Sequence, residues 1–269
     1  MSAPIRRAFA DLPHGQVHYA ACGEDQAPAV LLLHQTPRSW TEYRAVLPLL
    51  GERFHAIAMD TAGFGDSAPL PGAPTIERWA EVALQLMDAL SIAQAHVVGH
   101  HTGGVIAVEL AATHGARVRS LVLSSTPFTN ESFRIARAQR PPIDEVEFSA
   151  DGDHLTALWR KRQAFYPAGR PDLLQAFVAD ALKVQGDVEG GHRAVARYRM
   201  EDRIPHLLRI PTLLLHAPDD PFAAPHTAEW RLLLPHAKTV EIAGGMVPLP
   251  DQLPEAFAAA VTAFLERVP

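Results

Sequence analysis

Cysteine is almost absent from this sequence, which excludes the small secreted folds that depend on disulfides. A single cysteine, Cys22, occurs in 269 residues, so no disulfide can form within the chain. This composition favours a reducing compartment, and we expect a cytoplasmic protein. The first nine residues include Arg6 and Arg7 but no apolar run, so we expect no signal peptide.

Three further absences narrow the function. The net charge is −6 and no basic cluster occurs, which argues against nucleic acid and anionic membranes as partners. No apolar run approaches the ~18 residues that a membrane-spanning helix needs. The first buried apolar run ends in His34-Gln35-Thr36-Pro37 instead of a G-x-G-x-x-G turn, and no P-loop occurs. We therefore expect no nucleotide or other organic cofactor.

Apolar runs and helical patterns alternate along most of the chain. Continuous apolar runs such as 30–34 are typical of parallel strands that are covered on both faces. Strands are expected at 16–21, 30–34, 54–59, 95–98, 118–124, 210–216 and 239–242, and helices at 40–50, 75–90, 103–114 and 253–268. This order predicts an α/β fold with a mostly parallel central sheet and helices on both faces.

One segment departs from the alternation. Between Pro127 and Pro205 the patterns are helical, at 155–165 and 171–184, and no buried strand run occurs. We interpret residues 128–205 as a helical cap inserted over a core of residues 1–127 and 206–269. The alternative is a set of longer crossover helices in the main layer.

Five motifs follow the expected strands in order. An apolar strand leads into Gly99-His100-His101-Thr102-Gly103 and a helix leads out, which matches the strand-turn-helix pattern G-x-S-x-G except for its central residue. The other motifs are Val30 to Pro37, Asp60 with Gly63, Gly65 and Ser67, Leu213 to Pro221, and Ala243 to Phe257. Together they resemble the α/β-hydrolase superfamily, in its capped branch, over nearly the whole chain.

The departures from that family's pattern decide the chemistry. His101 stands where the nucleophilic serine belongs, Met246 where the triad histidine belongs, and Gln35 where a glycine belongs. Only the acid position is kept, by Asp220 or its neighbour Asp219. The resemblance therefore implies the family's scaffold but not its Ser-His-Asp mechanism.

His101 is expected to keep a catalytic position in a changed chemical role. The tight turn predicts a backbone near the left-handed region, with Gly99 and Gly103 giving room. The positive end of the following helix and burial under a cap both disfavour a second proton on the ring, so we expect a neutral imidazole at neutral pH. A neutral imidazole can act as a base, a nucleophile or a metal ligand.

An oxyanion site is expected beside this ring. The resemblance places the backbone N–H groups of Thr36 and Thr102 toward a substrate oxygen. The amide of Gln35 could add a donor, or its side chain could distort the loop. Asp220 is expected to orient His101 or to contact the pocket.

For several other residues a structural role competes with a functional one. Asp60 and His34 are expected to hold turns. Met246 is expected to form an apolar pocket wall. Trp159, Phe165 and Tyr166 are candidate lid residues, and packing within the cap is their alternative and favoured role. The candidate zinc ligands are His34, Asp60, His100, His101, His216 and Asp220. None of the usual ligand spacings occurs among them. We expect no metal.

The sequence thus predicts an enzyme that acts on a small, largely apolar carbonyl compound. His101 would be the base or nucleophile, in a hydrolase or in a lyase, isomerase or decarboxylase that works next to a carbonyl. The alternative is a degenerate relative that binds a small molecule under its cap without turnover. A small molecule is the only expected partner, and the sequence leaves open a monomer or a homodimer.

Overall fold

The computed structural model describes residues 4–268, and of the leading stretch 1–9 the residues 1–3 lie outside this description. One eight-stranded sheet runs through the described part of the chain, in the order β1-β2-β4-β3-β5-β6-β7-β8. β1 pairs antiparallel with β2, and β2 pairs antiparallel with β4. The remaining neighbours, from β4 across to β8, pair parallel. The strands are β1 (Arg6–Leu12), β2 (Gly15–Cys22), β3 (Ala29–Leu33), β4 (His55–Met59), β5 (Ala95–His100), β6 (Val118–Ser124), β7 (Thr212–His216) and β8 (Lys238–Glu241).

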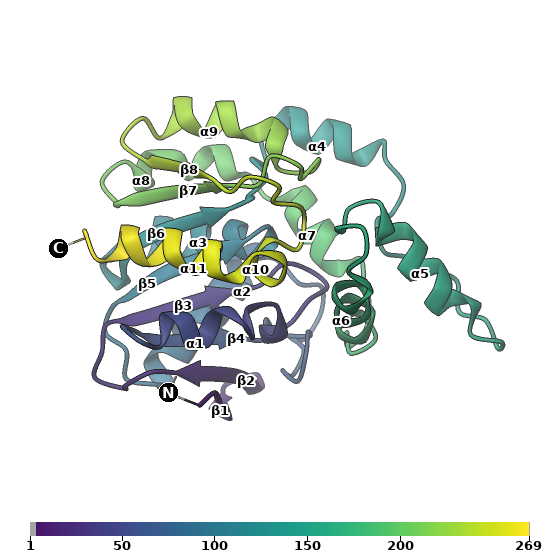
Figure 1. The fold of residues 1–269 in the computed structure, drawn as a ribbon, viewed down its shortest axis with the longest axis horizontal. Coiled ribbons are helices and arrows are strands. Elements are labelled where there is room, and N and C mark those ends of the chain that lie inside the picture. The colour runs from purple at the N-terminus through teal and green to yellow at the C-terminus, as the bar shows by residue number, and fades with distance from the viewer. Residues whose placement is uncertain (1–3, 269) are drawn as a thin grey trace.

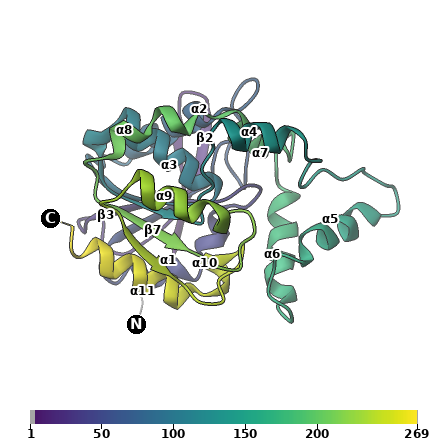
Figure 2. The ribbon, with the colours of Figure 1, turned by 90° about the horizontal axis from the view of Figure 1, so that it is seen from above.

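Helices cover both faces of this sheet, as Figures 1 and 2 show. The helices of the main body are α1 (Val46–Leu50), α2 (Ile76–Ala89), α3 (Thr102–Thr113), α8 (Ile204–Leu207), α9 (Thr227–Leu233), α10 (Leu249–Gln252) and α11 (Pro254–Leu265). Short 3₁₀ turns occur at Trp40–Tyr43, Gly115–Arg117, Met200–Asp202 and Ala224–His226. The α/β-hydrolase fold expected from the motifs is confirmed.

Both faces of β3 are covered, and its sequence is accordingly a continuous apolar run. Leu31 and Leu33 join the core on one face of the sheet, together with Trp79 of α2. Val30 and Leu32 join the core on the other face, with Phe257 of α11. Because successive side chains of a strand point to opposite faces, a strand covered on both sides must be apolar at every position.

The segment between β6 and β7 contains helices and no strand in this described part of the chain. It begins with α4 (Glu131–Ala138), α5 (Asp153–Gln163), α6 (Pro171–Ala181) and α7 (Gly190–Arg197), and the 3₁₀ turn Met200–Asp202 and α8 follow. Figures 1 and 2 show α5 and α6 beyond one end of the sheet, with α4 and α7 nearer the main body. A small apolar cluster joins Leu158, Tyr166 and Phe177 to Val247 of the main body. The division into a core and a cap domain stays a prediction.

Element boundaries differ from the expected ones where the signal was local. β1 was not predicted, and it pairs only with β2. The helix expected at 40–50 is a 3₁₀ turn followed by the short α1, with the chain turning at Arg44 and Ala45. None of the helices that the structure describes is long and apolar enough to cross a bilayer.

Candidate functional site

The turn between β5 and α3 places His101 at its apex. The residue has a φ of 47° and a ψ of −113°, the positive φ expected from the motif. A Cβ on Gly99 would lie 2.2 Å from the carbonyl oxygen of Gly103, and one on Gly103 would lie 1.9 Å from the carbonyl oxygen of Leu33. Only glycine fits at these two positions, so the sequence pattern specifies this strained turn.

Asp220 is the acid that pairs with His101. Its Oδ2 lies 2.6 Å from Nε2 of His101, and its side chain is fully buried in the loop after β7. Its Oδ1 accepts hydrogen bonds from the backbone N–H groups of Phe222 at 2.9 Å and Ala223 at 3.3 Å. Asp219 is exposed and contributes only its backbone, which donates to Gly245. The structure thus decides between the two candidate acids.

The environment of Asp220 favours its charged form. Burial raises the pKa of this carboxyl group, but the charge interaction and hydrogen bond with His101, together with the bond from Phe222, outweigh burial and lower the pKa. A carboxylate accepts and cannot donate, so Nε2 of His101 must carry the hydrogen that they share. The remaining ring nitrogen, Nδ1, has no hydrogen-bond partner among the described residues.

The imidazole of His101 faces an open cavity of about 650 Å³, and 12% of its side chain is exposed. Thr36, Thr102 and Val247 line the same cavity. The ring is therefore not turned into the protein interior, and a substrate of moderate size fits in front of it.

His100 packs against the ring of His101 and bonds the surrounding backbone. Its ring lies edge-on to that of His101, with 4.7 Å between ring centres. Burial, followed by the charge of His101, lowers the pKa of His100 to about 3. Its two nitrogens lie 2.9 Å from Oγ of Ser124 and 2.8 Å from the carbonyl oxygen of Val247. His100 is thus a neutral, fully bonded group that holds the loop of Val247 against the elbow.

Thr36 and Thr102 lie side by side in the cavity lining. Their hydroxyl oxygens lie 2.8 Å apart, and both side chains are buried. Thr102 is the first residue of α3, where backbone N–H groups have no partner within the helix. Within residues 4–268 the N–H groups of both threonines lack a hydrogen-bond acceptor. Both N–H groups therefore belong to residues that line the cavity and have no acceptor within the described part of the chain.

The side chain of Gln35 is not free to act as a third donor. Its Nε2 donates to Oε1 of Glu42 at 2.5 Å, and its backbone N–H donates to Oε2 of Glu42 at 2.9 Å. A weaker contact of 3.4 Å joins Nε2 to the carbonyl oxygen of Val247. Gln35 lines the cavity, but its amide is committed to Glu42 and holds the loop that carries Thr36.

Two expected pocket residues do not line this cavity. Met246 lies outside its lining, and the next residue, Val247, lines it instead. Trp159 of α5 packs against the apolar cluster of Leu158, Tyr166 and Phe177, whereas Phe165, also a candidate lid residue, lines the cavity. Packing around the end of α5 and the turn of the loop after β8 decide which residue faces inward, and the sequence does not fix either.

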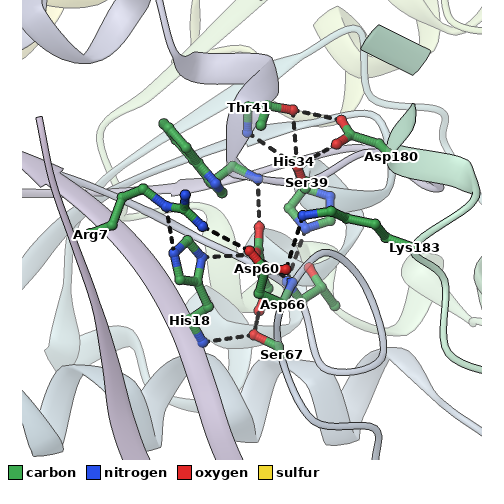
Figure 3. A network of polar contacts seen from close by, with 12 residues as sticks. Arg7, His18, His34, Ser39, Thr41, Asp60, Asp66, Ser67, Asp180 and Lys183 are labelled. Atoms are coloured by element: carbon green, nitrogen blue, oxygen red, sulfur yellow. Dashed lines mark hydrogen bonds and ion pairs between the residues drawn. The ribbon is translucent and has the colours of Figure 1, made fainter. Parts of the chain in front are cut away.

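Asp60 holds the turn after β4, as expected, and has no place in the cavity lining (Figure 3). Its carboxylate accepts from the backbone N–H groups of Trp40 at 2.6 Å and Asp66 at 3.0 Å, and lies 2.8 Å from Nδ1 of His18. His34 is buried and bonds the backbone of Gln35 and Thr61, as expected for a structural residue.

A second polar network fastens α6 to the loop after β3 (Figure 3). The carboxylate of Asp180 accepts from Arg38 at 2.8 Å, Ser39 at 2.8 Å and Thr41 at 2.6 Å. Arg38 also donates to Asp251 of α10 at 2.6 Å. The helical segment is thereby tied to the loop that carries Thr36.

The six residues weighed as zinc ligands do not form a metal site. No three of them have ligand atoms within 4.8 Å of one another in the described part of the chain. Two other groups meet that distance, and hydrogen bonds and ion pairs within the protein already join their members: His18 with Asp60 and Asp66, and Asp144 with Glu189 and His192.

Sequence reasoning missed the part of the cavity wall supplied by the helical segment. Arg137, Arg140, Lys161, Arg162 and His192 all line the cavity. The only available signal was a set of basic residues in a segment assigned to the cap, which resembles an ordinary charged surface.

Comparison with known proteins agrees with this architecture. A family model described as alpha/beta hydrolase fold matches residues 28–246. "Bifunctional epoxide hydrolase 2" of Rattus norvegicus is 33% identical over 138 residues, which covers 46% of this chain and 24% of that protein. "2-hydroxymuconate semialdehyde hydrolase" of Pseudomonas sp. (strain CF600) is 42% identical over 86 residues, which covers 32% of this chain and 30% of that protein. The chain thus spans less than a third of either relative.

Solved structures match over almost the full chain. An enol-lactonase from Burkholderia xenovorans LB400 superimposes with a TM-score of 0.79 at 24% identity, over 97% of this chain and 100% of that chain. An esterase from Rhodococcus sp. ECU1013 superimposes with a TM-score of 0.80 at 21% identity, over 100% of both chains. At these identities the likeness shows the fold alone.

Proposed function

Since the chain belongs to the alpha/beta hydrolase fold family, we propose that it is an enzyme for a small carbonyl compound, with His101 as its base or nucleophile. The observation that carries this proposal is the bond between Nε2 of His101 and the buried Asp220. It leaves Nδ1 available at an open cavity, beside the unpartnered N–H groups of Thr36 and Thr102. We propose that the ring reacts in its neutral form, with its hydrogen on Nε2.

As a base, His101 would take a proton from the carbon next to a carbonyl group. The C–H bond breaks, the proton moves to Nδ1, and the electron pair forms an enolate whose oxygen accepts from the two threonine N–H groups. Preorganised donors of this kind are worth about 3–4 kcal/mol of transition-state stabilisation in a water-poor site. Asp220 would stabilise the imidazolium that results. Elimination or isomerisation then depends on the groups that the substrate carries. In a decarboxylation the C–C bond to the carboxylate would break instead, CO₂ would leave, and the resulting enolate, held by the same N–H groups, would take a proton from water.

As a nucleophile, Nδ1 would attack the carbonyl carbon of an ester. The oxyanion of the tetrahedral intermediate accepts from the same N–H groups, the C–O bond to the alcohol breaks, and an acyl-imidazolium that keeps its Nε2 hydrogen remains. The released alkoxide takes a proton from water, and the resulting hydroxide attacks the acyl carbon. The C–N bond then breaks, the carboxylic acid leaves and the neutral ring is restored. Both routes use the same three elements, so one site supports either reaction.

The named activities of the relatives support an enzyme over a binding protein. They are described as hydrolases of epoxides and of a semialdehyde, and others as haloalkane dehalogenases. A protein that only binds a small molecule would not need a titratable side chain at the apex of a strained turn, paired with a buried carboxylate. Replacement of the family's serine is the observation that favours the binding alternative.

A substrate screen with the full chain and with His101→Ala tests the proposal. The panel contains nitrophenyl esters and carbonyl compounds with an acidic neighbouring C–H bond. We expect turnover by the natural protein and its loss in His101→Ala. His206→Ala, which removes an exposed histidine outside the cavity lining, serves as the control. Equal turnover by all three proteins would remove His101 from the mechanism, and binding without turnover would favour the alternative.

A further inference from the structure

Polar residues from two parts of the chain line the cavity. His101, Thr36 and Thr102 come from the main body of the fold. The segment between β6 and β7 supplies four cationic side chains to the lining: Arg137, Arg140, Lys161 and Arg162. Glu229 is the only carboxylate of the described residues in the lining, and it accepts a hydrogen bond from Asn130 at 2.8 Å.

Two of these four cations form ion pairs with buried carboxylates of the protein. Arg162 is buried and forms a two-pronged ion pair with Asp144, whose pKa is held well below its usual range by Arg162 despite burial. Arg137 lies 3.7 Å from the buried Glu189. These pairs hold the wall in place and leave little charge for a ligand.

Arg140 and Lys161 have no such partner. Neither side chain forms an ion pair with any carboxylate in the part of the chain that the structure describes. Lys161 donates to the backbone carbonyl oxygen of Glu145 at 2.6 Å, which carries no net charge. Both side chains are exposed and line the cavity, so two positive charges without an ion-pair partner are accessible to a ligand there.

Much of the remaining lining is apolar and includes Phe133, Ile143, Phe165, Val195 and Phe222. A ligand that contacts both His101 and the cationic side chains therefore combines apolar and anionic groups.

We propose that Arg140 and Lys161 form an anion-binding subsite and that the substrate carries a carboxylate at the end away from the reacting carbonyl. This inference rests on the proposed function of His101 and narrows the expected substrate from largely apolar to apolar with one charged end. A net charge of −6 makes the chain as a whole repel anions, so a local excess of positive charge is required to attract one. The interaction weakens as salt screens it.

A matched pair of esters tests the subsite through turnover. Mono-4-nitrophenyl glutarate and 4-nitrophenyl valerate have the same acyl length and differ in a terminal carboxylate or methyl group. We expect kcat/KM to favour the glutarate ester by about tenfold at low salt, which equals about 1.4 kcal/mol. Arg140→Gln/Lys161→Gln should abolish this preference. Arg160→Gln/Arg209→Gln removes the same charge from two exposed positions outside the lining and should keep it.

Binding without reaction separates this inference from the proposed function. Hexanoate and hexanamide have the same shape, and their affinities are compared by ligand-observed NMR on His101→Ala with and without the Arg140→Gln/Lys161→Gln changes. We expect hexanoate to bind more tightly, only when both cations are present. Hexanoate that binds no better than hexanamide, or does not bind, would overturn the subsite even if turnover needs His101. Charge-dependent binding without ester turnover would support the subsite and count against the proposed reaction.

Discussion

Replacement of Asp220 by asparagine gives the most direct test of the His101 dyad. In the natural protein Oδ2 of Asp220 lies 2.6 Å from Nε2 of His101, and Oδ1 accepts from Phe222. Asparagine has the same shape and can keep Oδ1 as the acceptor for Phe222. Its NH₂ group then faces Nε2 and can only donate. The ring must accept at Nε2 and carry its hydrogen on Nδ1, so the nitrogen that faces the cavity loses its lone pair.

The size of the effect follows from this change of tautomer. In Ser-His-Asp enzymes the equivalent replacement lowers kcat by about 10⁴-fold because the imidazole is held in the wrong tautomer. A factor of 10⁴ corresponds to about 5.4 kcal/mol of activation free energy. We expect a loss of about 10³- to 10⁴-fold in Asp220→Asn, in kcat more than in KM, because the substrate contacts are unchanged.

Two measurements check this expectation. Steady-state kinetics on a substrate from the screen gives kcat and KM, and ¹⁵N NMR of the histidine ring reports which nitrogen carries the hydrogen without any substrate. Asp219→Asn is the matched control, because this neighbouring carboxyl group is exposed and its side chain does not reach His101. If Asp220→Asn keeps natural activity and the same ring tautomer, the dyad does not work as described.

Three further predictions use the same geometry. His101→Ser should show no esterase activity with 4-nitrophenyl acetate, because no other imidazole bonds Asp220 and could activate the serine. Appearance of activity would reveal another base. Gly103→Ala should lower the unfolding free energy, measured by denaturant titration, by at least about 2 kcal/mol, because the new Cβ would lie 1.9 Å from the carbonyl oxygen of Leu33. Gly115→Ala is the control and should cost little, because the nearest atom to its Cβ would be 3.9 Å away. Burial raises the pKa of Glu42 from 4.5 to about 7, so its contribution to stability is present below about 4.5 and is lost as the pH rises through about 7; the unfolding free energy of the natural protein should therefore fall over this range relative to Glu42→Gln, and parallel curves would contradict the shift.

Local patterns predicted the scaffold well because the scaffold is built from local rules. A buried parallel strand must be apolar throughout, and the elbow accepts only glycine at Gly99 and Gly103, so both features are visible in the sequence. The antiparallel β1 carried no such signal. Its alternating burial is weak, and its register comes entirely from pairing with β2.

The site was predictable only as far as those same motifs reach. His101, Thr36 and Thr102 follow from strand ends that meet at one edge of the sheet, and all three line the cavity. Met246 and Trp159 are not among the residues that line the cavity, and the sequence could not show this because the direction of a loop or helix side chain depends on long-range packing. The cationic wall has the same cause, since α4, α5 and α7 come together only in the tertiary structure.

The exchange of serine for histidine at the elbow explains the other departure from the family pattern. In that pattern the acid after β7 binds a histidine from the loop after β8, and that histidine serves a serine at the elbow. Here the elbow residue is itself an imidazole and reaches Asp220 directly at 2.6 Å. The loop after β8 then has no imidazole to supply, and Met246 lies outside the cavity lining while its backbone N–H donates to Gln252. The acid thus keeps an imidazole partner although that partner comes from another part of the chain. A histidine in the loop after β8 has no acid partner left in such a rearrangement. Its replacement by Met246 therefore does not by itself indicate an inactive enzyme.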